Sequence, residues 1–245
     1  MKVILDVTYS EKTNEKLDIY LPEKESFPVF VYYHGGGITA GDKKNTRPFY
    51  EHLASSGIAV VTVNYRLYPN AKYPDFIEDC AEAASWVYKN IARYGKIEGI
   101  YLGGSSAGGY ISQMLCFDKK WLAEYGLTPM DFSGFVHDAG QPTCHFNVLK
   151  ARGFDSRRIV VDEYSPLYFV GSDEKYPPML IIVSDNDMKN RYEQTMLLME
   201  TLDHFGHGES AELIVMSGKH CAYLDTTDQD GKNIFGKIVE KFILK

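Results

Sequence analysis

The chain contains little cysteine, with four residues among 245, at Cys80, Cys116, Cys144 and Cys221. No CxxC pair occurs, which excludes the common zinc-ribbon and thioredoxin-type dithiol patterns. Four scattered thiols in a chain of this length do not form a disulfide framework. We therefore expect a reducing compartment, and the cytoplasm as the location of the protein.

Long apolar runs and an excess of positive charge are also missing. The first twelve residues hold only three consecutive aliphatic side chains before Asp6, whereas a signal peptide needs an apolar stretch of about 7–15 residues and a membrane helix about 20. Lys and Arg number 26 against 33 Asp and Glu, giving a net charge of −7, so no cationic field is available for a phosphate backbone. We expect a soluble protein that binds neither membrane nor nucleic acid.

Short apolar runs typical of β-strands recur along the chain: Val3–Val7, Leu17–Leu21, Val29–Tyr33, Ile58–Val63, Gly99–Leu102, Phe135–His137, Met179–Val183 and Leu213–Met216. The first two alternate in polarity, which suits an edge hairpin, and most of the others are nearly continuous, as in strands buried on both faces. No repeat or Ser/Gly linker divides the sequence. We expect one domain over residues 1–245.

Between these runs, apolar residues recur at helical spacing in Asp75–Tyr94, Arg191–His204 and Asn233–Ile243. The second of these helices is expected to bury Met196, Leu197, Met199 and Leu202. Strand–helix alternation predicts an α/β fold, with a mostly parallel central sheet covered by helices on both faces. The polar and aromatic segment 141–175 breaks the alternation and is expected to be an insertion, or lid, over a site.

The strongest chemical signal is Gly104-x-Ser106-x-Gly108, directly after the apolar run Ile100–Leu102. A nucleophilic serine must project from a tight strand-to-helix turn, and small flanking residues allow the backbone to make that turn. A plain glycine-rich turn is the alternative interpretation. The position between a buried strand and the helical run Tyr110–Leu115 favours the nucleophile.

A second glycine-rich loop, His34–Gly37, follows the predicted strand Val29–Tyr33. Attack on an ester builds negative charge on the carbonyl oxygen, which preorganised backbone N–H donors stabilise. This loop is positioned to supply some of those donors, and the residue after the nucleophile, Ala107, supplies another. A phosphate-binding loop is excluded because neither GxGxxG nor GxxxxGK[ST] occurs in the chain.

A serine nucleophile needs a histidine base and an acid. The chain has seven histidines: His34 belongs to the glycine loop, and the others are His52, His137, His145, His204, His207 and His220. His220 alone lies on the loop after the last predicted strand, where the triad order of Ser, acid, His places the base. The acid should follow the strand Met179–Val183, where Asp185 and Asp187 compete.

Together these residues resemble the α/β-hydrolase esterases related to hormone-sensitive lipase and the small bacterial carbohydrate and aryl esterases. The resemblance covers most of the chain and rests on His34–Gly37, Gly41–Lys43, Asn64–Leu67, Tyr73-Pro74 with Glu78-Asp79, Gly103–Gly109, Ser165–Leu167 and Gly218–His220.

This resemblance implies that Ser106 is the nucleophile, His220 the base, and Gly36, Gly37 and Ala107 the oxyanion donors. It places the acid at the end of Ser184–Asp187, favouring Asp187 over Asp185, with Asp162 in the insertion as a further alternative. Tyr65 and Arg66 are expected to be structural.

The sequence departs from the family pattern in three places. Ser105 stands before the nucleophile, where Asp or His is usual, and only 33 residues precede the His34–Gly37 loop. Segment 135–175 carries His137, Asp138, Gln141 and His145, which we expect to give a more polar lining than a long acyl chain favours. The last two departures favour a short or polar ester.

We therefore predict a serine carboxylesterase that hydrolyses short acyl or aryl esters of small molecules without metal or cofactor, and esters of sugars are among the candidate substrates. An amidase or formamidase could use the same triad. A peptidase of the prolyl-oligopeptidase type is disfavoured because the chain has no room for a propeller. A nicotinamide-dependent reductase is disfavoured because the glycine fingerprint is missing after Val29–Tyr33. A catalytically inactive binding protein would usually have lost the serine or the histidine.

Overall fold

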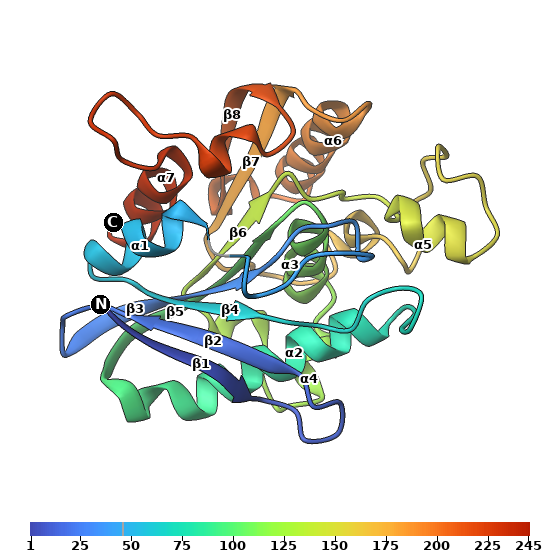
Figure 1. Cartoon of the computed structure of the whole chain (residues 1–245). Helices are drawn as coiled ribbons and strands as arrows, with labels where there is room; N and C mark the ends of the chain where they lie inside the picture. Colours follow the sequence, from blue (N-terminus) through green and yellow to red (C-terminus); the bar gives the residue numbers. More distant parts are fainter. Residues whose placement is uncertain (46) are drawn as a thin grey trace.

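One eight-stranded sheet forms the centre of the computed structural model, which describes residues 1–45 and 47–245 (Figure 1). Its strand order is β1-β2-β4-β3-β5-β6-β7-β8. The strands are β1 (Lys2–Thr8), β2 (Lys16–Leu21), β3 (Ser26–Tyr33), β4 (Ala59–Val63), β5 (Lys96–Ser105), β6 (Gly134–Asp138), β7 (Met179–Asn186) and β8 (Ala211–Lys219). β1 and β2 form an antiparallel edge hairpin, and β4, β3 and β5 to β8 are parallel to one another. The eight predicted strands and the edge hairpin are confirmed.

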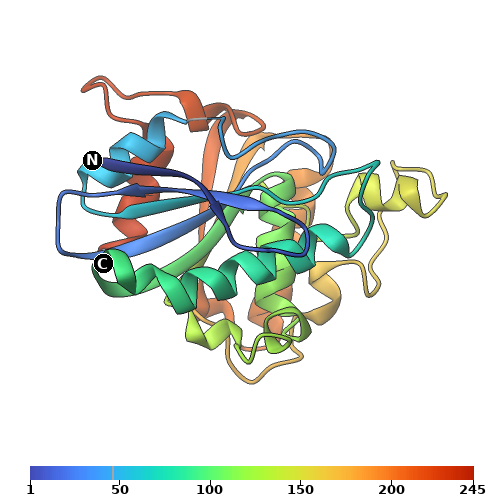
Figure 2. The ribbon, with the colours of Figure 1, turned by 60° about the horizontal axis from the view of Figure 1, so that its bottom comes forward.

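Helices cover both faces of this sheet, as predicted. The α-helices are α1 (Pro48–Ser55), α2 (Asp75–Asn90), α3 (Ala107–Phe117), α4 (Lys120–Ala123), α5 (Phe146–Ala151), α6 (Arg191–His204) and α7 (Ile234–Ile243). α1 and α7 pack with each other on one face, while α2, α3 and α6 contribute to the larger core on the other (Figures 1 and 2). Within the described ranges, no helix is both long and apolar enough to cross a bilayer.

Short 3₁₀ helices complete the architecture: η1 (Ile91–Tyr94), η2 (Pro129–Asp131), η3 (Pro166–Phe169), η4 (Gly208–Ser210) and η5 (Ala222–Asp225). The predicted helix over 75–94 is therefore α2 continued by η1. The prediction for the buried face of α6 was partly wrong, because Leu197 is 48% exposed and Leu198 is fully buried instead. Leu198 and Leu202 lie four residues apart on the inner side, and Leu197 is rotated away from them.

The segment 141–175 connects β6 to β7 and includes α5 and η3. Figure 1 shows α5 standing out from the body of the molecule. The segment is tied to the loop after β3, because the Asn147 side chain donates a hydrogen bond to the Gly37 carbonyl (2.7 Å). It therefore reaches the carboxyl end of the parallel strands, where ligands bind in sheets of this kind.

His137 and His145 are almost completely buried in this architecture and make the fold sensitive to acid. His137 exchanges a hydrogen bond with Ser112 (2.9 Å), and burial lowers its pKa to about 3. Burial, followed by the charge of Arg191, likewise lowers the pKa of His145 to about 3. An unfolded histidine titrates near 6.5, so the unfolded state binds the proton first. The stability contributed by each neutral ring is complete above pH 6.5 and is lost as the pH falls toward 3.

We expect this proton uptake to appear in unfolding experiments. Between pH 8 and pH 5 one such histidine should cost about 2 kcal/mol of unfolding free energy. Urea titrations at both pH values should therefore show a smaller pH dependence for His137→Asn than for the unmodified chain. His204→Gln, at an exposed position, serves as the control and should leave the pH dependence unchanged. Equal pH dependence in all three proteins would contradict the assignment.

Candidate active site

Ser106 lies on the sharp turn between β5 and α3. Its backbone angles are φ 56° and ψ −111°, in a region that residues other than glycine seldom occupy. The turn is held by two hydrogen bonds: the Ser106 N–H donates to the Asp138 carbonyl (2.8 Å), and the Tyr110 N–H donates to the Ser106 carbonyl (3.0 Å). Such a strained strand-to-helix turn presents the serine hydroxyl at the end of the sheet.

The glycines around Ser106 are required by close backbone packing. A Cβ on Gly108 would lie 1.9 Å from the Tyr33 carbonyl oxygen, and one on Gly104 would lie 2.5 Å from the same atom. Contacts this short do not occur for real side chains, so a larger residue would push α3 (at Gly108) or β5 (at Gly104) away from the end of β3. The predicted need for small residues beside the serine is explained by this contact.

His220 follows the end of β8 and reaches across to the serine. Its Nε2 lies 2.8 Å from the Ser106 Oγ. The carbonyl of the preceding Lys219 accepts a hydrogen bond from the Ser184 hydroxyl (3.0 Å), which fixes the loop against the end of β7. The next residue, Cys221, has a φ of 55°, so the chain turns sharply after the imidazole.

Asp187 lies on the other side of the imidazole, directly after the end of β7. This strand is three residues longer at its carboxyl end than predicted. Its Oδ1 lies 2.6 Å from the His220 Nδ1 and also accepts the Met188 N–H (2.6 Å). Burial of this carboxyl raises its pKa, but the hydrogen bond and charge of His220 outweigh burial, and the pKa is below its ordinary value. Asp187 is therefore a carboxylate at neutral pH.

The competing acids make other contacts. The Asp185 Oδ1 accepts the backbone N–H of Gly218 (2.8 Å), which stabilises the loop before the histidine. Asp162 forms an ion pair with Arg152 (2.8 Å) in the insertion. Of the three predicted alternatives, the structure thus brings Asp187 to His220.

The loop after β3 lies against the serine. A Cβ on Gly35 would be 3.4 Å from the Ser106 Cβ, and the positive φ angles of Gly36 (119°) and Gly37 (64°) form a tight turn beside it. Tyr65 supports this loop, since its hydroxyl donates to the His34 carbonyl (2.6 Å) and its ring stacks on the His34 imidazole. The structural role predicted for Tyr65 fits these contacts.

The backbone N–H groups of Gly36, Gly37 and Ala107 donate to no acceptor in the described parts of the chain, 1–45 and 47–245. Ala107 is also the first residue of α3, where the helix dipole is positive. Ala107 follows Ser106 in the chain, and the two glycines follow Gly35, which contacts Ser106, so these donors are available to an anionic oxygen. The arrangement can activate a serine and stabilise a tetrahedral oxyanion.

Polar residues of segment 135–175 do border the pocket described below, but for three of the four residues named in the prediction that position was wrong. Three of these residues are at most 1% exposed: His137, Asp138 and His145. The first two lie at the end of β6, which is covered by β5 on one side and β7 on the other, so their side chains bond inside the protein. Among the four residues named for this lining, Gln141 alone borders a pocket.

Sequence reasoning missed two supports of the site. Asn147 holds the Gly37 carbonyl, as described above, and the buried Asp138 accepts a hydrogen bond from Tyr223, three residues after His220. Burial raises the pKa of Asp138 to about 6, against opposing hydrogen bonds from Ser105 and Tyr223 and the charge of His220. Nothing local in the sequence marks Asn147. The only signal for Asp138 was its position at a strand end.

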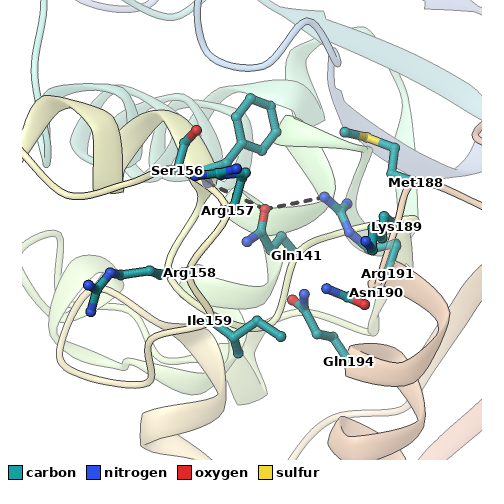
Figure 3. A pocket seen from close by; sticks show the side chains of 11 residues that line it. Gln141, Ser156, Arg157, Arg158, Ile159, Met188, Lys189, Asn190, Arg191 and Gln194 are labelled. Carbon is teal, nitrogen blue, oxygen red and sulfur yellow. Dashed lines mark hydrogen bonds between the residues drawn. The ribbon is translucent and has the colours of Figure 1, made fainter.

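A pocket of about 250 Å³ opens near the site, and its lining includes none of the triad residues or proposed oxyanion donors (Figure 3). Its wall includes Phe146, which lies beside Gly37, and Met188, which follows Asp187 in the chain. The pocket is therefore bounded by neighbours of the oxyanion loop and of the acid. Among the described residues, no group of three or more His, Cys, Asp or Glu side chains could hold a metal ion.

Comparison with known proteins gives matches in sequence and in fold. Residues 17–126 match the family model described as BD-FAE. The probable carboxylesterase 7 of Arabidopsis thaliana is 27% identical over 275 residues, covering 98% of this chain and 86% of that protein. Carboxylesterase NlhH of Mycobacterium tuberculosis is 37% identical over 163 residues, or 59% of this chain, and the match spans half of its length.

Two solved esterases share the whole fold at low sequence identity. Esterase B of Lactobacillus rhamnosis superposes with a TM-score of 0.79 at 18% identity, covering 98% of this chain and 84% of that one. The thermophilic esterase Est2 of Thermogutta terrifontis, bound to propionate, gives a TM-score of 0.77 at 20% identity, covering 99% and 93%. The predicted fold class is confirmed.

Proposed function

We propose that this chain, an α/β hydrolase of the serine-esterase group, hydrolyses short acyl or aryl esters through Ser106, His220 and Asp187. The observation that carries the proposal is the continuous hydrogen-bonded path from the Ser106 Oγ through both nitrogens of His220 to Asp187, with contacts of 2.8 and 2.6 Å. The Ser106 end of this path adjoins the backbone N–H group of Ala107 and the loop that carries Gly36 and Gly37. The carboxylesterase names of the Arabidopsis and Mycobacterium relatives support the same activity.

In the first half of the reaction Ser106 attacks the ester carbonyl carbon. His220 removes the hydroxyl proton as the Oγ–C bond forms, and the carbonyl oxygen becomes an oxyanion. When the tetrahedral intermediate collapses, the C–O bond to the alcohol breaks, and His220 returns the proton to the departing oxygen. The acyl group remains on Ser106.

In the second half water replaces the alcohol. His220 takes a proton from water, the resulting hydroxide attacks the acyl carbon, and collapse breaks the bond to the Ser106 Oγ. The proton returns to the serine, and the carboxylic acid leaves. Asp187 keeps the imidazole in the tautomer with its proton on Nδ1 and stabilises the imidazolium that forms in both halves.

The oxyanion formed in each step is proposed to bind the N–H groups of Gly36, Gly37 and Ala107. Backbone donors fixed before the reaction cost no reorganisation when the charge appears, and removing one donor of this kind typically costs about 10²–10³ in kcat. Asn147 stabilises this loop through the Gly37 carbonyl, so we assign it a positioning role.

An amidase or formamidase remains the second candidate, since it would use the same residues. A panel of 4-nitrophenyl acetate, butyrate and octanoate, alongside N-formyl and N-acetyl anilides, separates the two. We expect ester turnover that a serine-directed phosphonate abolishes. Turnover of the anilides with no ester hydrolysis would reverse the assignment, and no turnover of either class would indicate a binding protein. Cofactor-free chemistry and a cytoplasmic location remain our proposals from the sequence.

We predict a preference for short acyl chains. The pocket near the site has a volume of about 250 Å³, so an acyl group that enters it can be only a few carbons long. The kcat/KM should be higher for acetyl and butyryl than for octanoyl esters of the same alcohol, measured at substrate concentrations below micelle formation. A kcat/KM that rises steadily to the dodecanoyl ester would contradict this expectation.

A further inference from the structure

Arg191, the first residue of α6, carries a buried charge without a carboxylate partner. It is 3% exposed, and its guanidinium donates to the Ala139 carbonyl and to the Gln141 Oε1 (3.3 Å). Of the described carboxylates, none lies within 4.0 Å of it, although the more distant Asp187 attracts it. Because buried charges are normally paired, a guanidinium held by two neutral oxygens is able to bind an anion.

This guanidinium borders the pocket beside the catalytic residues (Figure 3). Lys189, Arg157 and Arg158 also line the pocket, and the lining contains no Asp or Glu, although the chain as a whole has a net charge of −7. Arg157 is 88% exposed and bonds both carboxylate oxygens of Asp155 (shortest contact 2.6 Å). Lys189 forms no ion pair with any of the residues the structure describes. The pocket is therefore locally cationic.

Neutral groups complete the lining. Gln194 is 7% exposed, and its Oε1 accepts a hydrogen bond from Thr143 (2.7 Å). Figure 3 shows the Gln194 amide reaching into the space between Ile159 and Asn190. Phe146, Ile159 and Met188 provide apolar wall. Such a lining suits a short hydrocarbon chain that ends in an anionic group.

The location links the pocket to the reaction. A Cβ on Gly37, a proposed oxyanion donor, would lie 3.5 Å from the Phe146 ring. On the opposite side, the Met188 N–H donates to Asp187 (2.6 Å). The pocket thus adjoins the oxyanion loop through Phe146 and the acid through Met188, so a substituent of the ester that extends past Phe146 would enter it.

We propose that this pocket is a subsite for a carboxylate on the substrate, so that the preferred esters are half-esters of short dicarboxylic acids or acyl esters of hydroxy acids. Arg191 and Lys189 bind the carboxylate, Arg157 adds to the positive field, and the apolar wall contacts the connecting carbons. This inference rests on the proposed esterase function and specifies its substrate class.

The test compares substrates that differ only in charge. For the acyl side the pair is mono-4-nitrophenyl glutarate and its glutaramate analogue, in which an amide replaces the carboxylate. For the alcohol side the pair is 4-acetoxybenzoate and 4-acetoxybenzamide. We expect kcat/KM to favour the anionic member of one pair by about tenfold or more at low ionic strength, as one charge-assisted hydrogen bond can provide. The pair that shows the preference identifies the side of the ester that enters the pocket.

Variants then assign the preference to the pocket. In the double variant Lys189→Gln/Arg157→Gln, kcat/KM for the anionic substrate should fall, while kcat/KM for the amide analogue stays unchanged. The ratio of the two values should therefore approach one. The matched control is Lys150→Gln, which removes an exposed cation of the same segment that does not line the pocket. This control should retain the preference. Arg191→Lys, which keeps the charge but loses the planar fork, should retain part of it.

Several outcomes would overturn the subsite. Equal kcat/KM within both pairs would do so, as would a preference that survives in the double variant or is lost equally in Lys150→Gln. In those cases Arg191 has only the structural role of holding the Ala139 carbonyl. Failure of the proposed function is distinct: it would appear as no hydrolysis of any ester, including 4-nitrophenyl acetate.

Discussion

Replacing Ser106 by alanine is expected to abolish ester hydrolysis and labelling by a fluorophosphonate. The Ser106 Oγ is the atom that His220 approaches to 2.8 Å, and without it no acyl-enzyme can form. In the subtilisin precedent loss of the nucleophile reduces kcat by about 2 × 10⁶. Initial rates with 4-nitrophenyl acetate measure the loss, and intact-mass spectrometry should show one phosphonate adduct in the unmodified protein and none in Ser106→Ala.

The neighbouring serine offers a matched control. Ser105 is 1% exposed and belongs to β5, so its hydroxyl is not presented to substrate. Ser105→Ala should still take up one adduct, on the peptide that carries Ser106. Labelling that persists at the same rate in Ser106→Ala would remove the assignment of the nucleophile, whatever the effect on turnover.

Local patterns in the sequence were sufficient for the strands and for the residues at their ends. A buried parallel strand is a short apolar run, and its carboxyl end lies at the same edge of the sheet as those of its parallel neighbours. Ser106, Asp187 and His220 each come at or directly after such an end. Their convergence follows from topology, which is why sequence reasoning could name them without knowing any distance.

The contacts that residues of segment 141–175 make could not be predicted from such local patterns. Polarity alone suggested that His145 faces a ligand, yet the ring is buried between Tyr110 and Phe146. The bond from Asn147 to Gly37 spans 110 positions, and no periodicity marks it. In the sequence, Arg191 is indistinguishable from any other first residue of a helix. Its side chain is buried without an ion pair because it donates hydrogen bonds to Ala139 and Gln141, which follow the end of β6.

Replacing Asp187 by asparagine is expected to reduce kcat by about four orders of magnitude, as in the serine-protease precedent. Asparagine can present an N–H to the His220 Nδ1 and thereby favour the tautomer that cannot accept the serine proton. The pKa of Asp187 lies below its ordinary value, so the unmodified carboxylate stays ionised at neutral pH, and the loss should be seen across the whole range from pH 6 to 9. Fluorophosphonate labelling of Ser106 should slow in parallel with turnover.

Asp185→Asn is the control for this prediction. It changes the same functional group two positions away, in a residue whose Oδ1 accepts the Gly218 N–H (2.8 Å). The asparagine Oδ1 can accept that bond equally well, so the loop before His220 should keep its place and kcat should stay within a few-fold of the unmodified value. Circular dichroism and a denaturant midpoint for both variants establish that each is folded. If Asp185→Asn abolished turnover while Asp187→Asn remained active, the acid would have to be Asp185, and the loop after β7 would have to rearrange to bring it to the imidazole.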